Sequence, residues 1–258
     1  MQHERQWISA SVAAVIVTLW LGTWMLLLAT DISQLPLVLI LVAIVWRTFI
    51  QTGLFIVAHD AIHGSIVPGA HRLNRAIGQL ALTLYALLPY EKLAFHHTQH
   101  HLQPARSGDP DFHDGVHNSI FAWYRKFMTE YLDRRQQVVL FFGMKAIFFT
   151  LFLGFHVHIP NLFLFWVLPI VFSSMQLFLF GTYLPHRVPD GSTEWNDPHN
   201  PHHATSRNHP PMLSFLTCYH FGYHWEHHEY PFLPWYRLPA ARQQTLQRSG
   251  INTGSGHS

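Results

Sequence analysis

The sequence contains a single cysteine, Cys218, among its 258 residues. One cysteine cannot form an intrachain disulfide or a cluster of thiolate ligands. Any metal site in this chain must therefore be built from imidazole and carboxylate groups. We interpret Cys218 itself as a small buried apolar residue.

Charged residues are also scarce. They make up 12% of the chain, against roughly 25% in an ordinary soluble domain. Much of the surface is therefore expected to face something other than water. The formal net charge of +2 and the lack of a basic stripe argue against a nucleic-acid-binding protein.

Two kinds of cofactor motif are missing as well. The chain contains neither a G-x-G-x-x-G sequence nor a cysteine cluster. It therefore predicts no flavin or nicotinamide site and no iron–sulfur centre. Any electrons that the chain uses must come from a separate donor.

Long apolar runs, in contrast, are abundant. Four of them, at about residues 7–30, 35–57, 138–155 and 162–184, approach the roughly 20 residues needed to cross a bilayer. Short links join the first pair and the second pair, which predicts two antiparallel transmembrane hairpins. A fifth run, at about residues 76–89, is too short to span and predicts a re-entrant or interfacial helix.

The rest of the chain completes the expected fold. The segment after residue 184 is rich in proline, histidine and tryptophan, which favours a histidine-rich cap on the helices. We expect an all-α integral membrane protein with one domain over residues 1–247 and a disordered tail over residues 248–258.

Basic residues predict the orientation in the membrane. Neither short link contains Lys or Arg, whereas Arg72, Arg125 and Arg187 fall on the other side. By the positive-inside rule that side is cytoplasmic, and it carries both termini. Arg47 and Lys145 lie inside predicted spans. We expect Lys145 to reach the interface and assign no role to Arg47.

The 22 histidines are concentrated in three clusters. Histidines at positions i, i+3 and i+4 share one face of a helix, so they can reach one metal centre together. All three clusters fall beside span ends on the predicted cytoplasmic side. Their members are His59 and His63; His96, His97, His100 and His101; and His224, His227 and His228, preceded by His220.

So many imidazoles near a membrane predict metal binding. A shared metal would explain their number and common depth, because polar groups held there without partners cost free energy. Eight or more imidazoles exceed the needs of one ion, so two metals are expected. Imidazole suits zinc, copper, iron and nickel, and the spacing does not choose among them.

With these clusters identified, the sequence resembles the membrane fatty-acid desaturase and hydroxylase superfamily. That superfamily is marked by an HxxxH-type motif followed by two HxxHH motifs. The corresponding positions here are His59–His63, His97–His101 and His224–His228, in that order. His96 precedes the second motif, which leaves open which residues of that run bind metal.

Within the superfamily the chain looks most like the β-carotene ketolases. Four segments carry this resemblance, at residues 58–64 (AHDAIHG), 108–112 (GDPDF), 181–187 (GTYLPHR) and 218–231 (CYHFGYHWEHHEYP). The resemblance covers about residues 40–240.

The resemblance implies a site of two Fe(2+) ions that uses O2 and an external electron donor such as a reduced ferredoxin. It also implies a further ligand directly after the fourth span, the position of His186. His220 is left open as a ligand or as a neighbour of one. Asp60, Asp109 and Asp111 are candidate acceptors for the outer N–H groups of the ligand imidazoles.

The implied activity is the conversion of β-carotene through echinenone to canthaxanthin, with possible use of 3-hydroxylated carotenoids toward astaxanthin. Each ring would be hydroxylated twice at C4 and then dehydrated to a ketone. Two alternatives remain at this stage. One is a carotenoid hydroxylase or fatty-acid desaturase with the same iron site, and the other is a histidine-rich metal transporter.

Overall fold

The computed structural model describes residues 2–248 except 114, 189–194, 196 and 199, with side chains from residue 7 onward. The predicted disordered tail, apart from Arg248, lies outside the described residues. All regular structure within them is helical, which confirms the predicted all-α class. The single-domain boundary at residue 247 stays a prediction.

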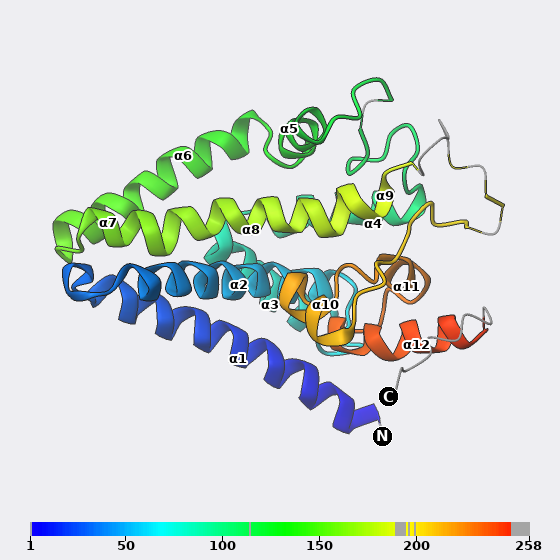
Figure 1. Ribbon diagram of the computed structural model, residues 1–258, viewed down its shortest axis with the longest axis horizontal. Coiled ribbons are helices and arrows are strands. Elements are labelled where there is room, and N and C mark those ends of the chain that lie inside the picture. Colours follow the sequence, from blue (N-terminus) through cyan, green and yellow to red (C-terminus); the bar gives the residue numbers. More distant parts are fainter. Residues whose placement is uncertain (1, 114, 189–194, 196, 199, 249–258) are drawn as a thin grey trace.

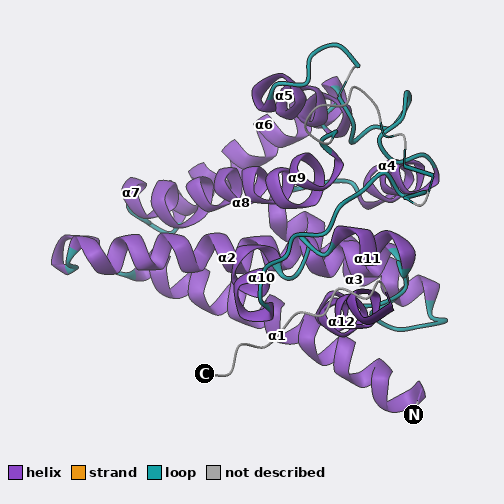
Figure 2. Cartoon of the chain, turned by 45° about the vertical axis from the view of Figure 1, so that its right-hand side comes forward, coloured by secondary structure: helices purple, strands orange, loops and turns teal. Residues whose placement is uncertain are grey.

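The helices follow one another along the chain, and the longest connections lie between α4 and α5 and between α9 and α10 (Figures 1 and 2). In order they are α1 (Gln2–Ala29), the 3-10 turn η1 (Ile32–Gln34), α2 (Leu37–Ile62), α3 (His71–Ala86), α4 (Tyr90–Leu102), α5 (Ile120–Tyr131), α6 (Arg134–Phe149), η2 (Thr150–Gly154), α7 (Ile159–Leu162), η3 (Phe163–Val167), α8 (Leu168–Phe178), η4 (Leu179–Tyr183), α9 (Leu184–His186), α10 (Pro211–Cys218), α11 (His224–Glu229), η5 (Trp235–Arg237) and α12 (Leu238–Arg248).

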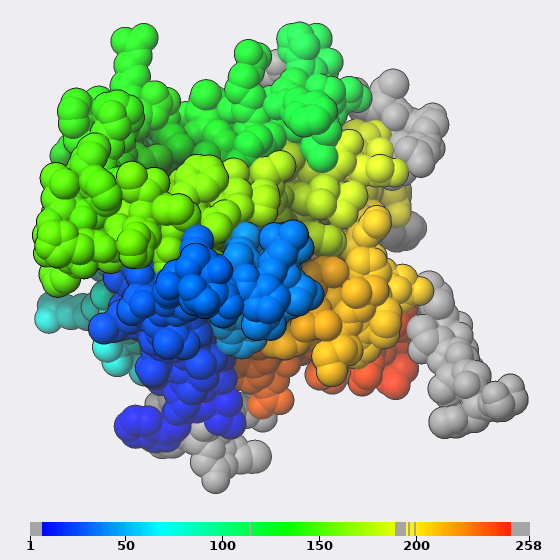
Figure 3. Space-filling view, turned by 60° about the vertical axis from the view of Figure 1, so that its left-hand side comes forward, coloured from blue at the N-terminus to red at the C-terminus, as the bar shows by residue number. Residues whose placement is uncertain are grey.

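Four helical stretches are long and apolar enough to cross a membrane. They are Trp7–Ala29, Leu37–Ile62, Arg134–Gly154 and Ile159–His186. In Figure 1 they run along the long axis of the molecule, while α4, α9, α11 and α12 gather at the end where α1 begins. Figure 3 shows side chains of the green α6–α8 segment lying against the blue side chains of the first two helices.

Two of these stretches continue beyond the apolar runs seen in the sequence. The second extends to Ile62 and the fourth to His186, because helical hydrogen bonding does not stop where hydropathy falls. Ala58 and Ala61 are buried on the extension of α2, so tertiary packing supports it. The added turns carry His59 and His186, which places these imidazoles on rigid helices.

Local sequence signals set several helix ends. Asp133 caps α6 by accepting a hydrogen bond from the backbone N–H of Gln136, and Ser119 caps α5 by accepting one from Ala122. Both satisfy a donor that the first helical turn leaves free. After α2, Gly64 adopts a positive φ of 71°, a conformation that glycine adopts without strain and that ends the helix.

The core surrounds α2, which packs against α1, α3 and α8. Three π-helical segments, η2, η3 and η4, interrupt the two later spans. Such segments widen the helix and often lie near functional sites. The last one, η4, directly precedes His186 and carries Gly181, whose lack of a side chain lets the ring of Phe221 approach the backbone.

Candidate metal centre

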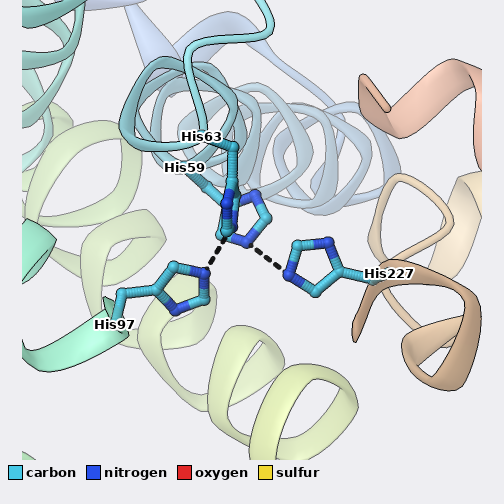
Figure 4. A group of neighbouring side chains, drawn as sticks. All are labelled: His59, His63, His97 and His227. Carbon is cyan, nitrogen blue, oxygen red and sulfur yellow. Dashed lines mark hydrogen bonds between the residues drawn. The ribbon is translucent and has the colours of Figure 1, made fainter. Parts of the chain in front are cut away.

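One group of histidines, which we call site A, consists of His59, His63, His97 and His227 (Figure 4). His59 and His63 lie one turn apart at the end of α2, His97 comes from α4 and His227 from α11. The Nε2 atoms of His59 and His227 are 3.2 Å apart, and those of His63 and His97 are 2.7 Å apart. Three separate helices therefore direct ring nitrogens toward one point.

A second group, site B, consists of His100, His186, His224 and His228. Its members come from α4, α9 and α11, and all four are buried. The Nε2 atom of His228 lies 3.1 Å from that of His100 and 3.1 Å from that of His224. In both groups the candidate ligand atoms all lie within 4.8 Å of one another.

His101 lies between the two sites. Its Nε2 atom is 3.1 Å from that of His97 and 2.9 Å from that of His227, both in site A. Its ring also stacks on that of His228 in site B, with the centroids 4.2 Å apart. The two sites are therefore neighbours, and His101 contacts imidazoles of both.

The spacing of these nitrogens fits metal coordination. A metal–imidazole bond is roughly 2.1 Å long. Two ligand nitrogens whose bonds to one metal meet at a right angle are therefore roughly 3 Å apart. The Nε2 pairs of both sites fall around this separation. His186 adds a second observation, because its Nε2 atom is buried without a hydrogen-bond partner and its ring lies 4.7 Å from that of His100.

Groups behind the ligand candidates fix the orientation of two rings. His100 Nδ1 lies 3.0 Å from both carboxylate oxygens of Asp109, and His186 Nδ1 lies 2.8 Å from the carbonyl oxygen of His203. Carboxylates and carbonyls only accept, so Nδ1 must donate in each case. The Nε2 lone pair is then free to face site B.

Burial keeps most of these imidazoles uncharged. It lowers the pKa of His63 to about 4, with a smaller contribution from His100. It also lowers the pKa of other ring groups well below the ordinary value, namely those of His97, His101, His224, His227 and His228. A neutral imidazole retains the lone pair that a metal requires.

His100 behaves differently because two carboxylates lie close to it. Burial alone would lower its pKa, but Asp111 and Asp109 outweigh that effect and raise it. Burial acts on the carboxyl of Asp111 in the opposite direction. It raises the pKa of this group to about 6, although His100 partly offsets the rise. Site B therefore has a carboxylate pair beside it, and site A does not.

The remaining predicted residues lie around the two sites rather than in them. The ring of His96 packs against Tyr131, and that of His220 packs between Tyr223 and Trp235. Asp60 accepts a hydrogen bond from the backbone N–H of Trp235, and its Oδ1 is 3.6 Å from His59 Nδ1.

Sequence reasoning missed several groups that support the site. Glu226 is fully buried, pairs with Arg242 at 3.0 Å and accepts a hydrogen bond from Ser206. Its position between His224 and His227 was the available signal, because a carboxylate on a buried helix needs a cation. The carbonyl of His203 gave no signal, since any residue supplies one.

An apolar cavity of about 280 Å³ opens beside the imidazoles. His59, His97, His100 and His224 form part of its wall, and the wall also contains Phe55, Leu93, Phe127, Leu140, Ile170 and Leu177. Asp111 and Tyr131 are among the polar residues of the wall. The arrangement can hold an apolar molecule with one end against the candidate metal centre.

A family profile described as fatty acid desaturase matches residues 33–252, which include both histidine sites. The chain belongs to this family. This membership confirms the resemblance to the fatty-acid desaturase superfamily that the histidine motifs indicated. The family uses histidine motifs to bind two iron ions, which agrees with the clustered histidines of this chain.

Known members of the family include close relatives of this chain. A β-carotene ketolase of Paracoccus sp. (strain PC1) is 40% identical over 92% of this chain and 93% of its own length. Another, from Paracoccus sp. (strain N81106 / MBIC 01143), is 42% identical over 76% of each chain. A zeaxanthin 4-ketolase of Chlamydomonas reinhardtii is 36% identical over 90% of this chain and 53% of its own length.

Proposed function

We propose that this chain is a β-carotene 4-ketolase, an O2-dependent oxidoreductase that converts β-carotene through echinenone to canthaxanthin. The observation that carries the proposal is the apolar cavity whose wall contains imidazoles of both histidine sites. The identity of 36–42% to ketolases over most of the chain supports the same activity.

We infer that each site holds one iron ion. His59, His63, His97 and His227, together with His101, would bind the first, and His100, His186, His224 and His228 would bind the second. When bound, the iron pair supplies the activation of O2 that breaking an allylic C–H bond requires. His96 and His220 pack against aromatic rings away from the sites, so we place neither among the ligands.

The chain itself positions the substrate and excludes water. A cavity of about 280 Å³ lies just below the range of roughly 300–1,000 Å³ for drug-sized ligands, and a carotenoid is longer than such a ligand. We infer that one ring enters the cavity while the rest of the polyene remains among the helices or in the bilayer. Aliphatic and aromatic walls then hold C4 toward the imidazoles.

The stoichiometry requires two oxidation cycles for each ketone. Each cycle consumes one O2, two electrons and two protons, inserts one oxygen atom at C4 and releases one water molecule. The first product is an alcohol and the second a geminal diol, which loses water to give the ketone. We infer that the electrons come from a separate reduced carrier, a ferredoxin or a similar protein.

The same proposal places the protein in the membrane. We infer two transmembrane hairpins, α1–α2 and α6–α9, with α3 at the interface and the histidine sites in a cytoplasmic cap. The links around η1 and before α7 contain no Lys or Arg, so the positive-inside rule puts both termini on the cytoplasmic side. One membrane domain over residues 1–247 would contain all of this.

The experiment is to produce the protein in cells that accumulate β-carotene and to identify the pigments. We expect echinenone and canthaxanthin, with red-shifted absorption. Zeaxanthin would instead identify a carotenoid hydroxylase, and altered acyl chains a desaturase. Metal uptake that does not depend on O2 would favour a transporter.

A further inference from the structure

Asp111 is held in place on three sides. Its backbone N–H donates to Asp109 Oδ1 at 2.8 Å, and its carbonyl oxygen accepts from the indole N–H of Trp123 at 2.6 Å. Its Oδ1 atom accepts a hydrogen bond of 2.5 Å from the hydroxyl of Tyr131. These contacts fix both the backbone and the carboxylate plane.

The second carboxylate oxygen of Asp111, Oδ2, is left for another partner. The residue is only 7% exposed and lines the apolar cavity. Within the described part of the chain, Oδ2 accepts no hydrogen bond. It is not among the fully buried atoms without a partner, whereas Nδ1 of His224 is one of them. A carboxylate oxygen in an apolar cavity strongly favours a hydrogen-bond donor.

The position of Asp111 relative to site B limits what that donor is. Asp109, which accepts the backbone N–H of Asp111, also orients His100. His59, His97, His100 and His224 share the cavity wall with Asp111. A donor bound to Oδ2 therefore lies in the same cavity as imidazoles of both histidine sites.

β-Carotene has no donor, but its oxidation product has one. The first cycle places a hydroxyl on C4, and a ketone forms only if the second cycle acts on the same carbon. An alcohol that left the cavity after the first cycle would have to return in the same orientation.

We propose that the Asp111 carboxylate accepts a hydrogen bond from the newly formed C4 hydroxyl and retains the alcohol in the cavity for the second oxidation. Tyr131 is the positioning residue: its hydrogen bond to Oδ1 keeps Oδ2 turned toward the C4 hydroxyl. This inference rests on the proposed ketolase function.

The main test uses Asp111→Asn, which preserves size and the acceptor for Tyr131 but replaces the charged acceptor with a neutral amide. In cells that accumulate β-carotene, we expect the ratio of released 4-hydroxylated carotenoid to ketone to rise about tenfold, the size of one hydrogen bond to a charged group. Consumption of β-carotene should fall much less. Glu130→Gln, on the exposed face of α5, is the matched control and should leave the ratio unchanged.

Supplying 4-hydroxy-β-carotene directly separates retention from a general structural role. The variant should lose activity on the alcohol while keeping most of its activity on β-carotene. Equal losses on both substrates, with an unchanged product ratio, would contradict the inference. A loss confined to zeaxanthin would show that Asp111 binds a C3 hydroxyl instead.

Two further measurements keep the test decisive if Asp111→Asn does not fold. Tyr131→Phe should shift the ratio in the same direction by a smaller factor. In the unmodified protein, given both substrates at equal concentration, we expect the alcohol to be consumed about tenfold faster than β-carotene.

Equal rates of consumption of the alcohol and of β-carotene would overturn the inference. It would also be overturned if the product ratio shifted in Thr182→Val and stayed unchanged in the Asp111 and Tyr131 variants. Thr182 lines the same cavity and is an alternative partner for the C4 hydroxyl. If the unmodified protein makes no ketone at all, the proposed function fails rather than the role of Asp111.

Discussion

At the scale of single residues, two of the ligand candidates, His100 and His186, are oriented by the groups behind them. Asp109 and the carbonyl of His203 select the ring nitrogen that His100 and His186 turn toward site B. Such partners affect metal binding nearly as strongly as the ligands do. Substitutions of the ligand candidates and of the groups that orient them therefore both test the metal centre.

We expect His227→Ala to abolish ketone formation and to lower the iron bound per chain. His227 lies 3.2 Å from His59 and 2.9 Å from His101, so its loss opens site A on one side. Pigment analysis and metal analysis of the purified protein measure the two effects. His71→Ala, at the exposed start of α3, is the control, and full activity in His227→Ala would remove His227 from the ligand set.

Asp109→Asn should weaken metal binding without deleting a ligand. The amide cannot replace both acceptor oxygens that face His100 Nδ1. Loss of such a partner lowers metal affinity by about 10–100-fold. Titration of the metal-depleted protein with Fe(2+) gives the affinity, and an unchanged value would show that Asp109 does not orient His100.

At the scale of helices, α4 carries histidines to both sites and is held by Tyr90 at its start. The hydroxyl of Tyr90 donates to the carbonyl of Ala61 on α2 at 3.2 Å, and its ring packs against Gly78 of α3. These contacts set the distance between the imidazoles of α2 and α4.

Gly78→Ala should therefore destabilise the protein and disturb site A. The added Cβ would lie 2.3 Å from Cε2 of Tyr90, and overpacking of this kind costs about 1–3 kcal/mol. Thermal unfolding in detergent micelles measures the loss. Gly22→Ala is the matched control, because nothing lies within 4 Å of its Cβ position, and there alanine should be neutral or slightly stabilising.

Arg47 and Lys145, which both lie inside spans, have different environments. Arg47 is fully buried and donates to the carbonyl oxygens of Phe165 and Trp20 and to the hydroxyl of Thr23. It thereby joins α2 to α1 and to the π-helical segment η3. Lys145 is exposed, with its ammonium group 3.8 Å from the centre of the Phe141 ring.

We expect Arg47→Lys to lower the free energy of unfolding by about 1–3 kcal/mol, because lysine cannot reproduce the forked donors and leaves buried acceptors unpaired. The reverse exchange at the exposed site, Lys145→Arg, should change it by less than about 0.5 kcal/mol. Denaturant unfolding in micelles compares the two. Equal effects would contradict a structural role for Arg47.

At the scale of the whole molecule, the buried imidazoles link stability to pH. Burial lowers the pKa of most of them, to about 4 for His63, and His100 is the exception. An unfolded histidine titrates near 6.5. Between these values the unfolded chain binds more protons than the folded one. The contribution of these histidines to the stability of the metal-free protein is therefore fully present above pH 6.5 and is lost as the pH decreases toward 4.

The unfolding temperature of chelator-treated protein, measured from pH 7.5 to 4.5, tests this dependence. His63→Gln should flatten the decline, because one titrating group is removed. Restoring Fe(2+) should raise the unfolding temperature at pH 7.5, since a ligand that binds only the folded state stabilises it. A midpoint independent of pH would mean that the imidazoles are not held neutral.

The linear pattern of residues was sufficient for part of this description. Apolar runs of about 20 residues predict helices that span a membrane, because a backbone in lipid must satisfy its own hydrogen bonds. Histidines at i, i+3 and i+4 predict shared helix faces, because helical geometry is local. The ligand candidates of the three motifs could therefore be named, and the resemblance added His186.

Only the tertiary structure decided how those residues combine. Each site draws on three helices, and α4 directs His97 to one and His100 to the other, although both belong to one motif. The roles of Asp109, the His203 carbonyl and the Glu226–Arg242 pair likewise depend on contacts between distant segments. Helix periodicity acts over a few residues, whereas the choice of partners is made by packing around α2, where burial and hydrogen bonding must be satisfied together.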